Sequence, residues 1–269
     1  MPSVNTGKKL IKSIKVYKDH VTLSFLRKET LKISKEAYLS SYLYEGKSLT
    51  NKEINKLKEL TALSTLLNYA MNLISKRHYS ERKMYEKLIK KEANKAAVMS
   101  VISKLKENDL LDDKAYMEDL LAWDDERGFG KNKTIKHLKE QGIPDNLIIK
   151  AHFSQSNELK KAKGLVPKLD RKYARYAFNN KKKHVYQALL SQGFDYEVAK
   201  EAIELVKGDS PRLEKEKLIN DYKKILKRLE NKYEGYQLKQ KVYSALLTKG
   251  YKGKDIRLVL EECNYENDF

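Results

Sequence analysis

The chain contains few of the residues that build disulfide-linked or metal-stabilised folds. It has 269 residues but one cysteine, Cys263, so an internal disulfide is excluded, and its Cys and His spacing fits no zinc site. No apolar run approaches the roughly 20 residues that span a membrane, and residues 1–5 lack the apolar segment of a signal peptide. We therefore expect a cytoplasmic protein without a membrane segment.

Proline and glycine are scarce, with 4 and 11 copies, while Lys, Leu and Glu are abundant, which favours helix over sheet. Only nine of the 56 cationic residues are arginine, although positive charges exceed negative ones by 19. This surplus indicates a negatively charged partner, either nucleic acid or an acidic protein assembly. Lysine is a point charge, so attraction to a backbone or a whole surface is favoured over base reading. An AT-rich genome would also explain lysine in place of arginine, but not the charge itself.

The first 50 residues differ from the rest. Apolar and polar side chains largely alternate over residues 11–16 and 21–25, on either side of the turn-like residues 18–20, and residues 31–33 offer a third short strand. These patterns predict a small antiparallel sheet. Thr50 and Glu53 then have the spacing of a helix capping box, and no strand signal follows them.

The remaining sequence predicts one helix after another in a repeating order. The second helix of successive units ends in a glycine followed by an apolar residue, at Gly142, Gly193 and Gly250, and Glu92 stands in that place in the first copy. A glycine there is typical of a helix that ends in the left-handed conformation. Copies roughly 50 to 57 residues apart indicate helical units that bury their apolar stripes against one another.

We therefore predict a mainly α fold, in which tandem three-helix repeats form an elongated curved array behind a small N-terminal antiparallel β segment. The predicted segments are an N-terminal β-rich extension (1–50), a first three-helix repeat with a lead-in helix (51–111), and second, third and fourth repeats (112–155, 156–208 and 209–269). Pro167 should break or kink the helix predicted over residues 158–178. We expect a monomer.

Two groups of basic residues are candidates for binding a partner or nucleic acid. In the first, basic and aromatic residues interleave, which suits base stacking beside phosphate contacts: Arg171, Lys172, Arg175, Lys181, Lys182 and Lys183, with Tyr173, Tyr176 and His184. The second group follows the sequence Gly128-Phe129-Gly130, whose amides could face an anion: Lys131, Lys133 and Lys136. The alternatives are a solvated helix face for the first group and a tight interhelical turn for the second.

The acidic residues predict no catalytic or metal site. Asp112, Asp119 and Glu126 recur at two-turn spacing near one helical face, too far apart for one small ion. Asp112 is better explained as a helix N-cap and the other acids as an exposed face, while Trp123 is assigned to the core. The five histidines share no i, i+4 pair, and no Ser–His–acid set is evident. We expect no enzymatic activity, no metal and no cofactor.

Several short motifs, in order, resemble the RecX family of recombinase modulators. The residues that carry the resemblance are Arg77 three positions before Ser80, Leu111-Asp112-Asp113 followed by Tyr116, Gly128-Phe129-Gly130-Lys131, and the stretch 138–143. The resemblance is firm over residues 62–152 and looser to residue 263. It departs at Glu92-Ala93, at Gln141, and in a length that fits a fourth unit, which looks like the longer members of Gram-positive bacteria.

The resemblance implies a non-enzymatic regulator that binds RecA, in particular its filament on single-stranded DNA, and lowers strand exchange, ATP turnover and co-protease activity. A row of similar units suits a long helical target, because weak contacts repeated along it multiply through effective concentration. A second class of function stays open, namely a helical repeat protein that binds single- or double-stranded DNA or RNA directly, without a recombinase partner. A third, a metal-dependent nuclease, would require DNA degradation that stops with a chelator.

Overall fold

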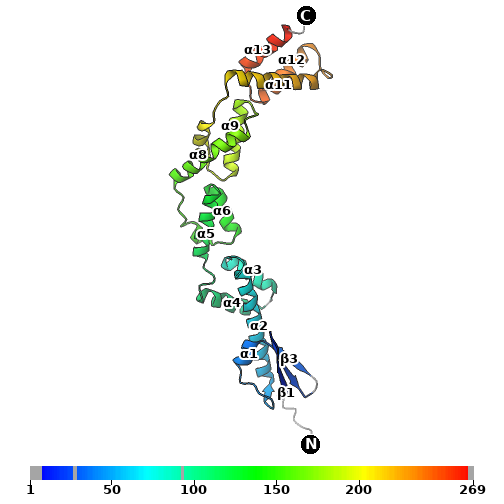
Figure 1. The fold of residues 1–269 in the computed structure, drawn as a ribbon, viewed down its shortest axis with the longest axis vertical. Helices are drawn as coiled ribbons and strands as arrows, with labels where there is room; N and C mark the ends of the chain where they lie inside the picture. Colours follow the sequence, from blue (N-terminus) through cyan, green and yellow to red (C-terminus); the bar gives the residue numbers. More distant parts are fainter. Residues whose placement is uncertain (1–7, 27–28, 92–93, 266–269) are drawn as a thin grey trace. The chain divides into compact units, whose positions relative to one another are not determined.

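The N-terminal part of the chain is an antiparallel sheet packed with helices. The computed structural model describes residues 8–26, 29–91 and 94–265. The sheet has the order β3-β2-β1-β4, with all neighbours antiparallel: β1 (Lys8–Val16), β2 (Val21–Phe25), β3 (Thr30–Ile33) and β4 (Ser48–Thr50) (Figure 1). α1 (Lys35–Leu39) and the first turns of α2 (Asn51–Ile74) share one apolar core with the sheet. The predicted sheet is confirmed, and β4 is a further strand that the sequence did not reveal.

Beyond the sheet, the regular structure of the described chain is helical, which confirms the mainly α prediction. The helices after α2 are α3 (Glu81–Lys91), α4 (Lys95–Glu107), α5 (Asp113–Glu126), α6 (Lys131–Glu140), α7 (Asp145–Ile148), α8 (Gln155–Lys172), α9 (Phe178–Ser191), α10 (Tyr196–Ala202), the 3-10 turn η1 (Ile203–Leu205), α11 (Pro211–Leu229), α12 (Gly235–Thr248) and α13 (Gly253–Tyr265). The capping box at Thr50 and Glu53 is confirmed. α8 continues through Pro167 and ends at Lys172, so the proline does not break the helix; the alternative that it kinks the helix stays a prediction. Residues 92–93, where the first glycine position falls, lie outside the described residues.

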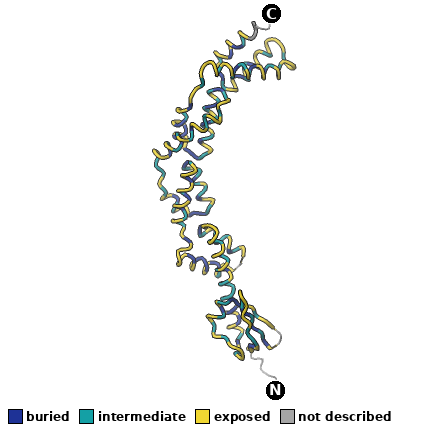
Figure 2. The backbone as a smooth tube through the Cα atoms, in the orientation of Figure 1, coloured by how far each residue is buried: buried dark blue, intermediate teal, exposed yellow. Residues whose placement is uncertain are grey.

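The chain divides into two compact units. The first comprises the described residues up to 119 together with 139–147, and the second comprises 120–138 with the described residues from 148 onward. Within the units, buried apolar residues gather where three consecutive helices meet: α2, α3 and α4 in the first unit, and α8, α9 and α10, then α11, α12 and α13, in the second. Figure 2 shows the buried stretches recurring along each of these helices. The apolar side chains that recur with helical period in the sequence thus pack together in local three-helix cores.

The starts of α3, α6 and α9 are each held by a carboxylate from a later helix. The first backbone amides of a helix have no partner within it, and its dipole favours negative charge there. Each carboxylate oxygen lies 2.8 Å from such an amide nitrogen: Asp113 from Glu81, Glu158 from Lys131, and Glu214 from Phe178. Burial raises the pKa of Asp113 above its usual value, although the hydrogen bond from the Glu81 backbone amide acts to lower it.

Beside each carboxylate, the same helix start also contacts the glycine turn that ends α6, α9 or α12. At the start of α6, the amides of Gly130 and Asn132 donate to the carbonyls of Gln192 and Gly193 at 2.8 and 2.9 Å. The equivalent bonds run from Ser80 Oγ to the Gln141 carbonyl at 2.6 Å, and from the side-chain amides of Asn179 and Asn180 to the carbonyls of Gly250 and Thr248 at 3.0 and 3.1 Å. We call each set of helix start, carboxylate and glycine turn a helix-start joint.

The joint at α6 requires glycine on both sides. Gly193 has a φ of +92°, and a Cβ there would lie 2.4 Å from the backbone nitrogen of Lys133. A Cβ on Gly130 would lie 2.5 Å from the backbone of Gly193 and Phe194. The capping glycine expected from the sequence therefore does more than end its own helix, because it lets two backbones touch.

Lys181 departs from the prediction that it belongs to an exposed basic group. Its side chain is only 2% exposed, because it occupies the buried face of α9 with Val185 and Leu189. Its ammonium donates to the Lys207 carbonyl at 2.6 Å and lies 3.1 Å from Asp170 and 3.8 Å from Asp209. Lys181 is a buried, neutralised cation and cannot reach a partner.

Replacing Gly193 with alanine should lower the free energy of unfolding by about 1–3 kcal/mol, since it imposes both a left-handed backbone and a clash. Urea unfolding followed by circular dichroism measures this. Gly164→Ala is the matched control, because Gly164 lies within α8 and an added Cβ there would meet no atom within 4 Å. That control should be neutral or stabilising by up to about 1 kcal/mol. Equal effects of the two variants would contradict the joint.

Replacing Lys181 with methionine should cost about 3–5 kcal/mol, because it leaves the carboxylate of Asp170 without its buried cation. The same change at the exposed Lys183 should stay within about 0.5 kcal/mol. Chemical unfolding of both variants compares them directly. A Lys181→Met protein as stable as Lys183→Met would show that Lys181 is not buried in solution.

Candidate partner-binding surface

Three aromatic rings meet where α8 ends and α9 begins. Tyr173 stacks on His184 with ring centroids 5.3 Å apart, and Tyr176 lies 4.3 Å from the same ring. All three rings are half-buried, so each keeps part of its surface in contact with solvent. The prediction that Tyr173 and Tyr176 stack on bases is untested; the structure places both rings against His184 and leaves part of each accessible.

Exposed cations surround these rings. Arg175 lies over the ring of Tyr176 at 5.0 Å, and Lys172 over that of Tyr173 at 5.1 Å. Arg171 and Lys183 are also exposed. We call this set the α8–α9 surface: Arg171, Lys172, Tyr173, Arg175, Tyr176, Lys183 and His184. It combines fixed positive charge with accessible π faces, which is the chemistry that binds single strands or acidic protein surfaces.

Lys182 is partly covered by two neighbouring side chains. Its ammonium lies 3.1 Å from Glu204 and 5.6 Å from the centre of the Phe178 ring. The run Lys181-Lys182-Lys183 therefore divides into a buried residue, a partly covered ion pair and an exposed cation. Of the three, Lys183 alone belongs to the α8–α9 surface.

The second predicted group mainly builds the joint at α6. The amide of Lys131 binds Glu158, and the ammonium of Lys133 lies 3.1 Å from Gln192 Oε1 and 3.6 Å from the centre of the Phe129 ring. Lys136 is exposed. The amides of Gly130 and Asn132 already donate to carbonyls, so this turn matches the alternative of a tight interhelical connection. A role of these lysines in binding stays a prediction.

Two residues of α5 differ from their predicted places. Trp123, expected in the core, is 46% exposed, and Asp124, expected on an exposed face, is fully buried and lies 2.9 Å from His137 Nδ1. The helical period explains this, since Asp124 follows the buried Met117 and Leu120 at the positions i, i+3 and i+7, whereas Trp123, six residues after Met117, lies off that stripe. Arg127 covers the exposed indole at 4.1 Å.

This arginine–aromatic pair has counterparts that sequence reasoning did not single out as a group. Arg77 lies 4.5 Å from the centre of the Tyr79 ring just before α3. Likewise, Arg127 lies 5.5 Å from the centre of the Phe129 ring before α6, and Arg175 lies over the Tyr176 ring before α9. The signal was present in the sequence as an arginine two residues before an aromatic, at Arg77 and Arg127. Cationic and aromatic groups therefore accompany the start of each of these helices.

The acidic residues behave as capping and pairing groups. Asp112 accepts from the amides of Lys114 and Ala115 at 2.8 and 3.1 Å, which confirms it as an N-cap. Burial opposes the charge on Lys161, but its hydrogen bonds to Glu158 and Asp125 raise its pKa above the usual value. Within the described ranges, no three His, Cys, Asp or Glu side chains gather as a metal ion would require. Nor does any described helix have the length and apolar character to cross a bilayer.

Comparisons with known proteins agree with the motif order. A family model described as RecX, first three-helix domain, matches residues 67–105. Regulatory protein RecX of Streptococcus pyogenes serotype M1 is 29% identical over 238 residues, which cover 86% of this chain and 91% of that protein. Regulatory protein RecX of Streptococcus agalactiae serotype III (strain NEM316) is 26% identical over 90% of this chain and 94% of that protein.

A solved structure shows the same fold. The crystal structure of a regulatory protein RecX superposes with a TM-score of 0.59 at 21% identity and covers 73% of this chain and 99% of that one. The matched domain model lies in the α2–α4 core, and the curated relatives extend the match over most of both chains. Over most of its length the chain is thus similar to regulatory proteins named RecX, and residues 67–105 match the RecX first three-helix domain.

Proposed function

We propose that this protein binds RecA and its filament on single-stranded DNA, and that binding lowers ATP turnover, strand exchange and co-protease activity. The observation that carries the proposal is the similarity to regulatory protein RecX over most of the chain. The net charge of +19 also supports the proposal, because it attracts the chain to acidic protein surfaces and to phosphate.

We propose the α8–α9 surface as one of the contacts. Arg171, Lys172, Arg175 and Lys183 supply exposed charge, and the rings between them supply stacking area. The arginine–aromatic pairs before α3 and α6 offer similar chemistry at other points of the chain. Contacts that are weak one by one gain strength when a filament presents many binding positions at once.

A second candidate function is direct binding of nucleic acid without a recombinase partner. The accessible rings of Tyr173 and Tyr176 beside two cations favour it, because base stacking needs no protein partner. The two functions differ in stoichiometry. A regulator of the filament inhibits the ATPase of purified RecA on single-stranded DNA at ratios too low to coat the DNA, whereas a DNA-binding module inhibits only near saturation.

Changing Arg171, Lys172, Arg175 and Lys183 together to glutamine should raise the concentration for half-inhibition of the RecA ATPase at least about tenfold, equivalent to about 1.4 kcal/mol. The matched control removes four exposed charges from α11, at Lys223, Lys224, Lys227 and Arg228, and should change that concentration less than about twofold. Equal effects would mean that total charge, and not the α8–α9 surface, governs binding.

The same variants test direct binding through salt dependence. If the α8–α9 surface binds phosphates, the slope of log K against log salt for single-stranded DNA should fall in magnitude by about 0.7 for each phosphate that the variant no longer neutralises. Fluorescence anisotropy of a labelled oligonucleotide at several salt concentrations measures that slope. A slope unchanged from the parent protein would show that this surface does not bind the nucleic-acid backbone.

A further inference from the structure

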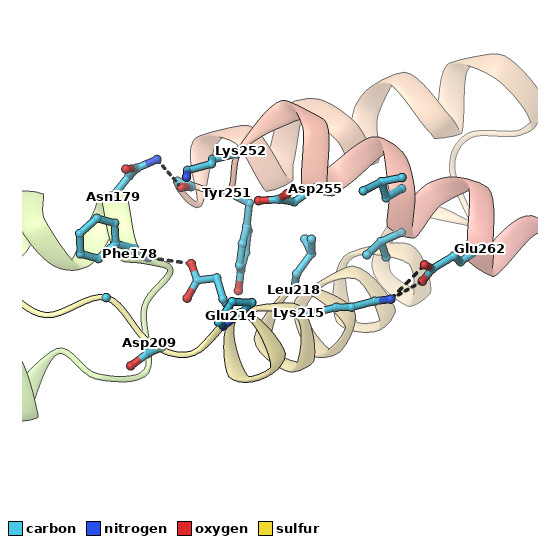
Figure 3. Close-up of a pocket in the computed structure, with 15 residues that line it drawn as sticks. Phe178, Asn179, Asp209, Glu214, Lys215, Leu218, Tyr251, Lys252, Asp255 and Glu262 are labelled. Atoms are coloured by element: carbon cyan, nitrogen blue, oxygen red, sulfur yellow. Dashed lines mark hydrogen bonds and ion pairs between the residues drawn. The ribbon is translucent and has the colours of Figure 1, made fainter.

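A cavity of about 550 Å³ opens between the start of α9, α11 and α13 (Figure 3). The side chains that decide its chemistry are Phe178, Glu214, Leu218, Tyr251, Asp255 and Val259. It adjoins the helix-start joint of α9, because Glu214 both lines the cavity and accepts the Phe178 amide. None of the residues assigned to the α8–α9 surface lines it.

The walls of the cavity are largely apolar. Leu218 and Val259 are buried, while Leu258 at the opening is 48% exposed. Tyr251 presents its ring, but its hydroxyl is committed to Asp221 Oδ2 at 3.0 Å. Burial, followed by that hydrogen bond, raises the pKa of Tyr251 far above its usual value, so the phenol stays neutral. The walls thus suit an aliphatic chain.

The charges of the cavity are opposite in sign to those of the protein as a whole. Four carboxylates line it against two ammonium groups: Asp209, Glu214, Asp255 and Glu262, against Lys215 and Lys252. Lys215 is held by Glu262 at 2.8 Å, and Asp209 is held by Lys217 from outside the lining. This negative excess would repel a nucleic-acid phosphate and attract a cation.

In the part of the chain that the structure describes, Glu214 lacks the ion-pair partner that the corresponding residue Glu158 has in the joint at α6. In the joint at α6, Glu158 binds the Lys131 amide through one oxygen and Lys161, three residues on, through the other at 2.6 Å. Glu214 has a lysine at the same spacing, Lys217, but that side chain turns to Asp209 and to the carbonyl of Tyr176. Oε2 of Glu214 is consequently buried without a hydrogen-bond partner among the residues that the structure describes.

An unsatisfied buried carboxylate oxygen is costly, and a cation entering the cavity would remove that cost. We propose that the cavity binds the side chain of a lysine or arginine supplied by a partner protein. The aliphatic stem lies along Leu218, Leu258 and Val259, and the cationic head meets the carboxylates of Glu214 and Asp255.

The test uses the full chain and two acylated dipeptide amides as probes, N-acetyl-Leu-Arg-amide and its neutral isostere with citrulline. Methyl NMR resonances of Leu218, Leu258 and Val259 report binding. The arginine probe should shift them saturably and bind at least about tenfold more tightly than the citrulline probe. Equal affinity of the two probes, or no saturable shift, would overturn the proposal.

Variants locate the site. Asp255→Asn and Glu214→Gln should each weaken the arginine probe about fivefold or more. Glu261→Gln, an exposed change on the same helix outside the lining, should leave its affinity unchanged. Asp255 is exposed and lies outside the joint, so its variant carries the test if Glu214→Gln does not fold. Equal affinities of all three variants would place the probe elsewhere and refute the site.

Two further outcomes would name a different occupant and overturn the proposal. Spermidine binding at least about tenfold more tightly than the arginine probe would make a free polyamine the ligand. A dimer in sedimentation that Asp255→Asn dissociates would make a second copy of this chain the occupant. None of these measurements contains RecA or DNA, so they succeed or fail independently of the proposed function.

Discussion

Each helix-start joint couples segments far apart in sequence through backbone groups that would otherwise be unsatisfied. The amides that begin α3, α6 and α9 are bound by Asp113, Glu158 and Glu214, and the adjoining glycine turns supply carbonyls to the same helix starts. Because these groups are polar and directional, they set which helix end meets which turn, while the apolar clusters supply most of the free energy. A structure built only on apolar stripes would leave that register free to slip.

The positive charge of the chain has two separate uses. Lys181 is buried beside Asp170, and the half-buried Lys161 pairs with Glu158 and Asp125. Removing Lys181 would leave a carboxylate without its buried cation. Arg171, Lys172, Arg175 and Lys183 stay outside, where solvent and salt screen them and where each contributes little to folding. The buried Lys181 therefore links α9 to Asp170 of α8, and the exterior cations remain available to a partner. Net charge alone does not separate the two groups.

Local patterns predicted much of the fold because short-range physics determines it. The capping box at Thr50 and the left-handed glycines Gly142, Gly193 and Gly250 depend on neighbours within a few residues. The burial of Lys181 was also readable, since it continues the i, i+4 stripe of Val185 and Leu189. What the sequence could not reveal is the counter-charge, because Asp170 and Asp209 reach Lys181 from different segments. The accessible rings of the α8–α9 surface were predicted as residue types, but their packing on His184 depends on the turn between two helices.

The direction of the helix-start joints has a consequence for biosynthesis. In every joint, the donor amide precedes its carboxylate in the chain: Glu81 before Asp113, Lys131 before Glu158, and Phe178 before Glu214. A ribosome releases the chain from its N-terminus, so each helix start emerges before its carboxylate has been translated. Its first backbone amides stay without that hydrogen bond until the later segment has emerged. A chain stalled between the two partners would expose its last helix start to water or to a chaperone. The joints are thus completed in order from the N-terminus, because each helix start is bound by a carboxylate that is translated after it.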